Sequence, residues 1–143
     1  MAPEKSPPEK SQPGELPPGK LLIVDDHAGM AVSIQMVAEA LGFACQTVND
    51  PEEATAAYVA FKPDILILDM MMPEKDGLEV LQEVLRTRVP SRIILISGYG
   101  DGFLQLGRQM ARGYQKQVVE LLKKPFRRED LVLLLTAPPE PVN

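Results

Sequence analysis

Five short apolar runs alternate with longer amphipathic segments along the chain, and this alternation predicts the fold. The runs are rich in Val, Ile and Leu, which is typical of strands buried on both faces. Parallel strands joined by right-handed helical connections form an open sheet with helices on both faces. We therefore expect an α/β protein with a doubly wound, five-stranded parallel sheet. The predicted strands are Leu21–Val24, Phe43–Val48, Ile65–Leu68, Ile93–Ile96 and Val118–Leu122.

Capping residues bound several of the amphipathic segments. Asp50 is predicted to cap the second helix, with Pro51 in the first turn. Gly42 is expected to end the first helix, and Asp101 to cap the fourth. The predicted helices are Ala28–Leu41, 51–61, Leu78–Arg86, Gly102–Arg112 and Arg127–Leu135.

The two ends of the chain differ in composition from the part between them. Residues 1–19 contain six of the 14 prolines together with Lys, Glu and Ser. Such a segment buries too little apolar surface to offset its chain entropy. We predict a disordered Pro-rich tail over 1–19, one folded domain over 20–137, and a C-terminal tail over 138–143.

Charge and residue counts exclude several kinds of site. The formal net charge of −5 disfavours nonspecific binding to nucleic acid or to anionic membranes, which requires a basic surface. The single cysteine, Cys45, excludes an internal disulfide and a cysteine zinc site, and we interpret it as a small core residue. The single histidine, His27, is expected at the start of the first helix. With no apolar leader and no long apolar stretch, the chain is predicted to be cytoplasmic.

Polar residues stand where the predicted strands end. Asp25 and Asp26 follow the first strand, Asp69 the third, Ser97 the fourth and Lys124 the fifth. These ends meet at one edge of a parallel sheet. Three clustered carboxylates repel each other, and Mg²⁺, which prefers oxygen ligands, would remove that repulsion. An aspartate can also form an acyl phosphate, with the lysine and the hydroxyl bound to phosphoryl oxygens.

This set of residues resembles the receiver domain of bacterial two-component response regulators. The resemblance includes Pro73 and Gly77 after Asp69, the pair Ser97-Gly98, and Lys124-Pro125-Phe126. It implies a flavodoxin-like strand order of 2-1-3-4-5. It also implies that Asp69 accepts a phosphoryl group from a sensor histidine kinase or a phosphotransfer protein. The ligands of Mg²⁺ would be Asp25, Asp26, Asp69 and the backbone carbonyl of Met71.

The family further implies how such a switch would act. Lys124 would bind the phosphoryl group, with a cis bond to Pro125, and Ser97 would move and reshape the surface that binds a downstream effector. A phosphorylation-dependent dimer is also compatible with this family. No enzymatic activity is expected beyond self-directed phosphotransfer and autodephosphorylation. Met71 and Tyr99 would flank the approach of water and slow that loss of phosphate.

One departure from the family and three alternatives remain open. Leu121 occupies a position where the family usually carries an aromatic switch residue, which puts an aromatic ring flip in doubt. The chain could instead be a degenerate receiver that binds a partner without phosphorylation. A phosphatase with an aspartate nucleophile needs a second Asp where Met71 stands. A nucleotide-binding fold needs a Gly-rich turn where Asp25, Asp26 and His27 stand.

Overall fold

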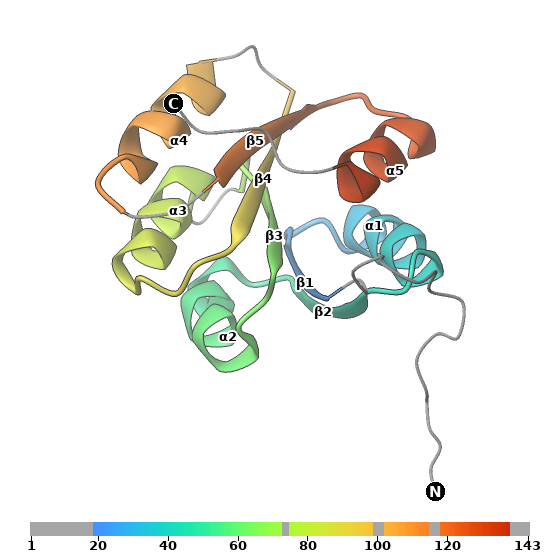
Figure 1. Ribbon diagram of the computed structural model, residues 1–143, viewed down its shortest axis with the longest axis horizontal. Coiled ribbons are helices and arrows are strands. Elements are labelled where there is room, and N and C mark those ends of the chain that lie inside the picture. The colour runs from blue at the N-terminus through green and yellow to red at the C-terminus, as the bar shows by residue number, and fades with distance from the viewer. Residues whose placement is uncertain (1–18, 73–74, 99–101, 115–117, 138–143) are drawn as a thin grey trace, which may run out of the picture.

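The five predicted strands form one parallel sheet of order β2-β1-β3-β4-β5 in a computed structural model, which describes residues 19–72, 75–98, 102–114 and 118–137 (Figure 1). The predicted fold class and strand order are therefore confirmed. The strands are β1 (Lys20–Val24), β2 (Ala44–Val48), β3 (Ile65–Asp69), β4 (Arg92–Ser97) and β5 (Val118–Lys123). The helices are α1 (Ala28–Ala40), η1 (Pro51–Glu53), α2 (Ala54–Phe61), α3 (Gly77–Arg86), α4 (Gly102–Ala111) and α5 (Arg128–Thr136).

The sheet separates two apolar layers, because successive side chains of a strand point to opposite faces. Leu21 and Ile23 of β1 pack in the layer under α1 and α5. Leu22 and Val24 pack in the layer under α2, α3 and α4. Figure 1 shows the two groups of helices on opposite sides of the sheet. Burial of each large apolar side chain contributes about 1.5–3 kcal/mol, so both layers hold the sheet rigidly.

The strand β2 departs from the expectation that every strand is buried on both faces. It lies at the edge of the sheet, and only Val48 at its carboxyl end is buried. Cys45 is half-buried against the α1 and α5 layer rather than fully inside it. Burial raises the pKa of its thiol to about 11, which agrees with a packing role. An edge strand has one unpaired side, which apolar periodicity alone does not indicate.

Local hydrogen bonds explain where the helices begin. His27 caps α1, as its predicted position requires, and its Nδ1 accepts from the amide of Met30 at 3.1 Å. Asp50 caps η1 and Asp76 caps α3 in the same way, through carboxylate oxygens. Gly42 follows α1 with φ of 102°, a conformation that glycine adopts without strain. Among the described residues, no helix is long and apolar enough to cross a membrane.

Candidate functional site

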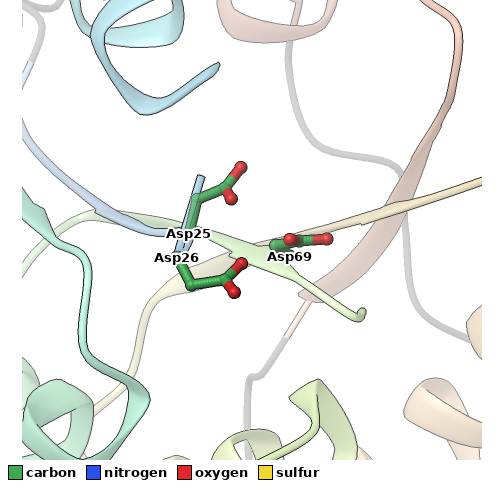
Figure 2. Close-up of side chains that lie close together, drawn as sticks. All are labelled: Asp25, Asp26 and Asp69. Atoms are coloured by element: carbon green, nitrogen blue, oxygen red, sulfur yellow. The ribbon is translucent and has the colours of Figure 1, made fainter. Parts of the chain in front are cut away.

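Three carboxylates converge at the carboxyl edge of the sheet (Figure 2). Asp25 follows β1 directly, Asp26 comes next, and Asp69 is the last residue of β3. The pairing of Val24 with Leu68 brings these strand ends into register. One oxygen from each carboxylate lies within 4.8 Å of the other two.

Burial makes this cluster electrostatically unfavourable by itself. Asp25 and Asp69 are only 1% and 2% exposed, and Asp26 is the more accessible member. Burial, together with the neighbouring charge of Asp69, raises the pKa of Asp25 to about 6. The amide of His27 donates to Asp25 Oδ1 at 2.9 Å, which works in the opposite direction. The carboxylates therefore need a positive charge that the nearby chain supplies only in part.

Asp25 Oδ2 is a carboxylate oxygen of the cluster that lacks a partner among the described residues. It is buried and has no hydrogen-bond partner within the described parts of the chain. Buried carboxylate oxygens are ordinarily paired, so an orphaned one beside two further carboxylates indicates a group whose charge a cation would satisfy. Hard oxygen donors at this spacing fit Mg²⁺. Met71 lies in the connection that follows β3, two residues after Asp69, and its amide donates to Asp69 Oδ1 at 3.2 Å.

Lys124 brings an ammonium group to the same edge. Its Nζ lies 3.5 Å from Asp69 Oδ1, and its side chain is 32% exposed. Its backbone amide donates to the carbonyl of Ser97 at 2.8 Å, which sets β4 and β5 side by side at their ends. Ser97 is fully buried, and the peptide bond between Lys124 and Pro125 is cis. Lys123 is exposed, as strand alternation predicts.

The structure adds two supports that the sequence interpretation did not assign. Asn49 follows β2 and donates from Nδ2 to the carbonyl of Asp25 at 2.9 Å. Its position at a strand end would have been a usable signal. Gly77 begins α3, and its amide donates to the carbonyl of Met70 at 3.2 Å. A Cβ atom at Gly77 would lie 2.6 Å from Met70 Cα and 2.8 Å from the carbonyl oxygen of Asp69. Only glycine therefore allows α3 to pack this closely behind Asp69.

A separate apolar pocket of about 900 Å³ lies between α1 and the start of α5. It shares Lys124 with the edge of the sheet, but none of the three carboxylates lines it. The cation chemistry therefore belongs to the carboxylates and not to this pocket. Pro73, Tyr99 and Asp101, which the sequence interpretation also used, lie outside the described residues.

Comparison with known proteins is consistent with this geometry. The family described as response regulator receiver domain matches residues 21–136. The alkaline phosphatase synthesis transcriptional regulatory protein PhoP of Bacillus subtilis is 28% identical over 107 residues, which cover 75% of this chain and 42% of PhoP. The chain thus spans less than half the length of that relative.

Two solved structures have the same fold. A response regulator from Colwellia psychrerythraea is 31% identical, with a TM-score of 0.67 over 82% of this chain and 94% of that one. The Vibrio cholerae chemotaxis protein CheY4 is 24% identical, with a TM-score of 0.68 over 82% of this chain and 96% of that one. The second likeness concerns the fold alone.

Proposed function

Because the chain belongs to the response regulator receiver domain family, we propose that it is a phosphorylation-dependent signalling switch whose phosphoacceptor is Asp69. The observation that carries the proposal is the environment of Asp69. It is buried at a strand end, within 4.8 Å of two carboxylates and 3.5 Å from the Lys124 ammonium. Carboxylate, metal-binding oxygens and a cation are the groups that transfer of a phosphoryl group to aspartate requires.

In the proposed transfer, an Asp69 carboxylate oxygen attacks the phosphorus of a phosphohistidine on a sensor histidine kinase or phosphotransfer protein. The new P–O bond forms as the P–N bond breaks, and the leaving imidazole takes up a proton. Lys124 Nζ holds one phosphoryl oxygen, and the Ser97 hydroxyl donates to another. Lys124 already lies 3.5 Å from Asp69 at a strand end, so it needs little reorganisation at the moment of transfer.

The residues proposed to hold Mg²⁺ are Asp25, Asp26, Asp69 and the backbone carbonyl of Met71. When bound, Mg²⁺ neutralises charge on the carboxylates and on the incoming phosphoryl group. The orphaned Asp25 Oδ2 and the raised pKa of Asp25 support this assignment. Without a cation, the same two features destabilise the charged site.

The proposed output is a change of partner-binding surface. Ser97 would move toward the phosphoryl group, and the shift would reach α4, β5 and α5, whose partners would be a downstream effector or a second phosphorylated copy. Leu121 on β5 is half-buried against the α2, α3 and α4 layer, so a packing change there would replace an aromatic ring flip. We propose no enzymatic activity beyond self-directed phosphotransfer and autodephosphorylation.

The remaining proposals concern context. We propose a cytoplasmic receiver domain over 20–137, flanked by tails at 1–19 and 138–143. The net charge of −5 supports protein partners over direct contact with nucleic acid or membrane.

Incubation with acetyl phosphate and Mg²⁺, followed by intact-mass measurement, tests the function. The wild-type protein should gain the mass of one phosphoryl group, and Asp69→Asn should gain none. Asp50→Asn is a matched control, because asparagine also caps a helix and Asp50 lies outside the carboxylate cluster. Phosphorylation of Asp69→Asn at the wild-type level would place the acceptor elsewhere.

A further inference from the structure

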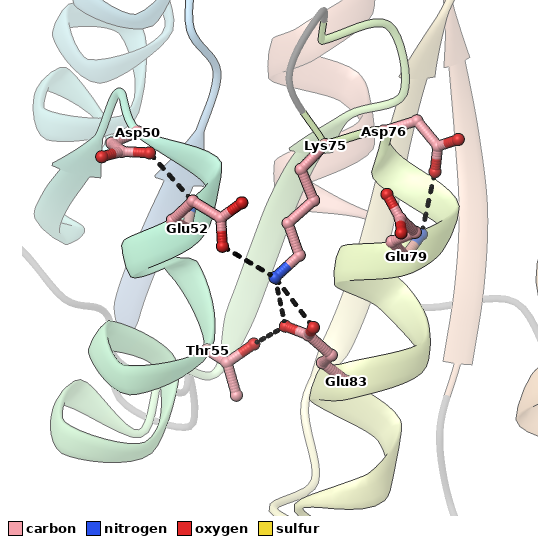
Figure 3. A network of polar contacts seen from close by, with 7 residues as sticks. All are labelled: Asp50, Glu52, Thr55, Lys75, Asp76, Glu79 and Glu83. Atoms are coloured by element: carbon pink, nitrogen blue, oxygen red, sulfur yellow. Dashed lines mark hydrogen bonds and ion pairs between the residues drawn. The ribbon is translucent and has the colours of Figure 1, made fainter.

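A second polar network joins α2, α3, η1 and the connection between β3 and α3, and it takes no part in the proposed chemistry (Figure 3). Lys75 Nζ lies 2.8 Å from both carboxylate oxygens of Glu83 and 3.6 Å from Glu52 Oε1. The Lys75 side chain is 13% exposed, although both carboxylate partners are considerably more open. A long cationic side chain kept this far from solvent is held in one orientation, which loses side-chain entropy. Such a constraint invites a functional explanation.

The network joins four separate parts of the fold. Lys75 belongs to the connection between β3 and α3, Glu83 to α3 and Glu52 to η1. Thr55 of α2 also donates to Glu83 Oε1, at 2.8 Å, so this network links α2 to α3 as well. The hydrogen bond to Lys75, followed by that to Thr55, lowers the pKa of Glu83, so this carboxylate stays charged.

Two residues of this network, Lys75 and Glu52, lie in segments that contact the carboxylate cluster. On one side, Lys75 lies in the connection that follows Asp69, and the Gly77 amide at the end of this connection donates to the carbonyl of Met70 at its start. On the other side, Glu52 follows Asn49, whose side chain donates to the carbonyl of Asp25. Lys75 therefore ties the segment after Asp69 to the segment that supports Asp25.

We propose that Lys75 is a positioning residue, which braces the β3–α3 connection against η1 and so sets the affinity of the carboxylate cluster for Mg²⁺. The inference rests on the proposed function, because it concerns the same metal site. Release of Lys75 would leave the Met71 carbonyl less well oriented, and ordering it again would weaken Mg²⁺ binding. Groups outside the ligand set commonly tune metal affinity in this way.

Simple electrostatics predicts the opposite change in Mg²⁺ affinity. Lys75→Met removes a positive charge near an acidic site, and a cation should then bind more tightly. Positioning predicts weaker binding in spite of that gain. The direction of the change therefore separates the two effects without any comparison of magnitudes.

Calorimetric titration with Mg²⁺ in the absence of a phosphoryl donor measures this direction. Lys75→Met should weaken binding about fivefold, less than the tenfold or more typical of groups bonded directly to a metal ligand. Lys75→Arg should stay within about twofold of wild type, because guanidinium also pairs with carboxylates. The matched control is Lys62→Met, since Lys62 is exposed at the end of α2 and makes no ion pair with described residues. The amide NMR signals of Met71 and Gly77 should shift in Lys75→Met alone.

A charge-neutral variant keeps the inference testable if Lys75→Met fails to fold. Thr55→Val removes the bond to Glu83 without changing the charge, and it should weaken Mg²⁺ binding about twofold, in line with one lost surface hydrogen bond. Unchanged or tighter binding in these variants, with wild-type protein binding Mg²⁺ normally, would overturn the positioning role alone. Absence of Mg²⁺ binding by the wild-type protein would instead remove the proposed function, and the inference with it.

Discussion

The two ends of the parallel sheet differ in how completely their buried charged groups are paired. At the carboxyl end, Asp25 keeps a buried oxygen without a partner among the described residues, beside Asp26 and Asp69. At the amino end, the Arg92 side chain is also largely buried, at 10% exposure, and it is paired with the Glu120 carboxylate. The first arrangement is incomplete without a cation, and the second is complete within the chain.

The amino end shows what full pairing looks like in this fold. Arg92 Nε donates to Glu120, and its Nη2 donates to Glu120 Oε2 at 3.2 Å and to the carbonyl of Leu134 at 2.8 Å. Its Nη1 reaches the carbonyl of Ala137 at 3.2 Å, so one guanidinium ties β4 and β5 to the end of α5. Nearby, the Tyr58 hydroxyl donates to the carbonyl of Val89 at 2.6 Å.

This contrast distinguishes residues that stabilise the fold from residues that are proposed to bind the metal. Buried polar groups are normally paired, and each unpaired one destabilises the fold unless a ligand completes it. The paired groups at the amino end contribute stability, and the carboxylates at the other end form the proposed Mg²⁺ site. Variants at the two ends should therefore change different properties.

The largest expected effect is at the amino end. Arg92→Leu removes the Arg92 partner of Glu120, whose side chain is 6% exposed, and it removes donors from the carbonyls of Leu134 and Ala137 at the end of α5. Loss of one member of a buried ion pair lowers the free energy of unfolding by about 3–5 kcal/mol. Urea denaturation should show this loss, while the affinity of the folded protein for Mg²⁺ stays at the wild-type value.

The double variant Arg92→Leu with Glu120→Leu provides the control for that prediction. It also removes the buried carboxylate that has lost its Arg92 partner, so part of the lost stability should return. A single variant that weakened Mg²⁺ binding while remaining folded would show that the two ends are not independent.

The next effect is at the carboxyl end, where a variant should change Mg²⁺ affinity and not lower stability. Asp26→Ala removes a proposed ligand and should weaken Mg²⁺ binding by at least about tenfold. Without metal, the free energy of unfolding should be equal to or above that of wild type, because one repelling carboxylate is gone. Calorimetry and metal-free thermal denaturation measure both, with Glu129→Ala on α5 as the charge-matched control. Wild-type affinity in Asp26→Ala would exclude Asp26 as a ligand.

A smaller effect is the pH dependence of the free energy of unfolding of the metal-free protein. Burial raises the pKa of Asp25 from 3.8 to about 6, so the folded state binds a proton more tightly than the unfolded state does. The resulting stabilisation is present in full below about pH 4 and is lost as the pH rises through about 6. Between pH 5 and pH 7.5 the Asp25 contribution should fall by about 1 kcal/mol.

Comparison with Asp25→Asn tests this contribution, because the variant lacks the titrating carboxyl group and groups distant from residue 25 titrate equally in both proteins. The difference in free energy of unfolding between wild type and Asp25→Asn should therefore change over that pH range, measured in chelator. A constant difference would mean that Asp25 titrates at its ordinary value.

Much of this molecule could be predicted from the sequence, for reasons that particular residues make clear. Buried strands such as Ile65–Asp69 are apolar on both faces, so their runs are nearly continuous. Residues directly after such strands, including Asp25 and Lys124, inherit defined positions at the sheet edge. The cap at Asp50 was predictable because a side-chain oxygen and a following proline act locally.

The features that were not predicted depend on distant pairs. The half-exposed state of β2 follows from its place at the edge of the sheet, which Ala44 and Cys45 do not encode locally. The bond between Arg92 and Glu120 joins residues 28 positions apart, and the contact between Lys75 and Glu52 depends on how α2 packs beside α3. Periodicity describes one element at a time, so it does not contain such contacts.

The smallest expected effect concerns water at the open carboxyl end. An acyl phosphate on Asp69 is lost when water attacks the phosphorus in line with the Asp69 oxygen. Met71 follows two residues later with a side chain that is 47% exposed, and we expect this side chain to cover that approach with an apolar group. Met71→Asn replaces this cover with an amide that can bind and orient water. The lifetime of the phosphorylated protein should then shorten about threefold, or about 0.6 kcal/mol in barrier height.

Phosphate release at equal Mg²⁺ concentration measures this lifetime in wild type and Met71→Asn. Met36→Asn is the matched control, because Met36 is 66% exposed but lies on α1, outside the carboxylate cluster. The backbone carbonyl of residue 71 is retained in the variant, so Mg²⁺ affinity should stay within about twofold of wild type. Faster decay together with unchanged affinity would separate the shielding role of the side chain from the ligand role of the carbonyl. Equal decay in both proteins would show that water reaches the phosphoryl group by a path that Met71 does not cover.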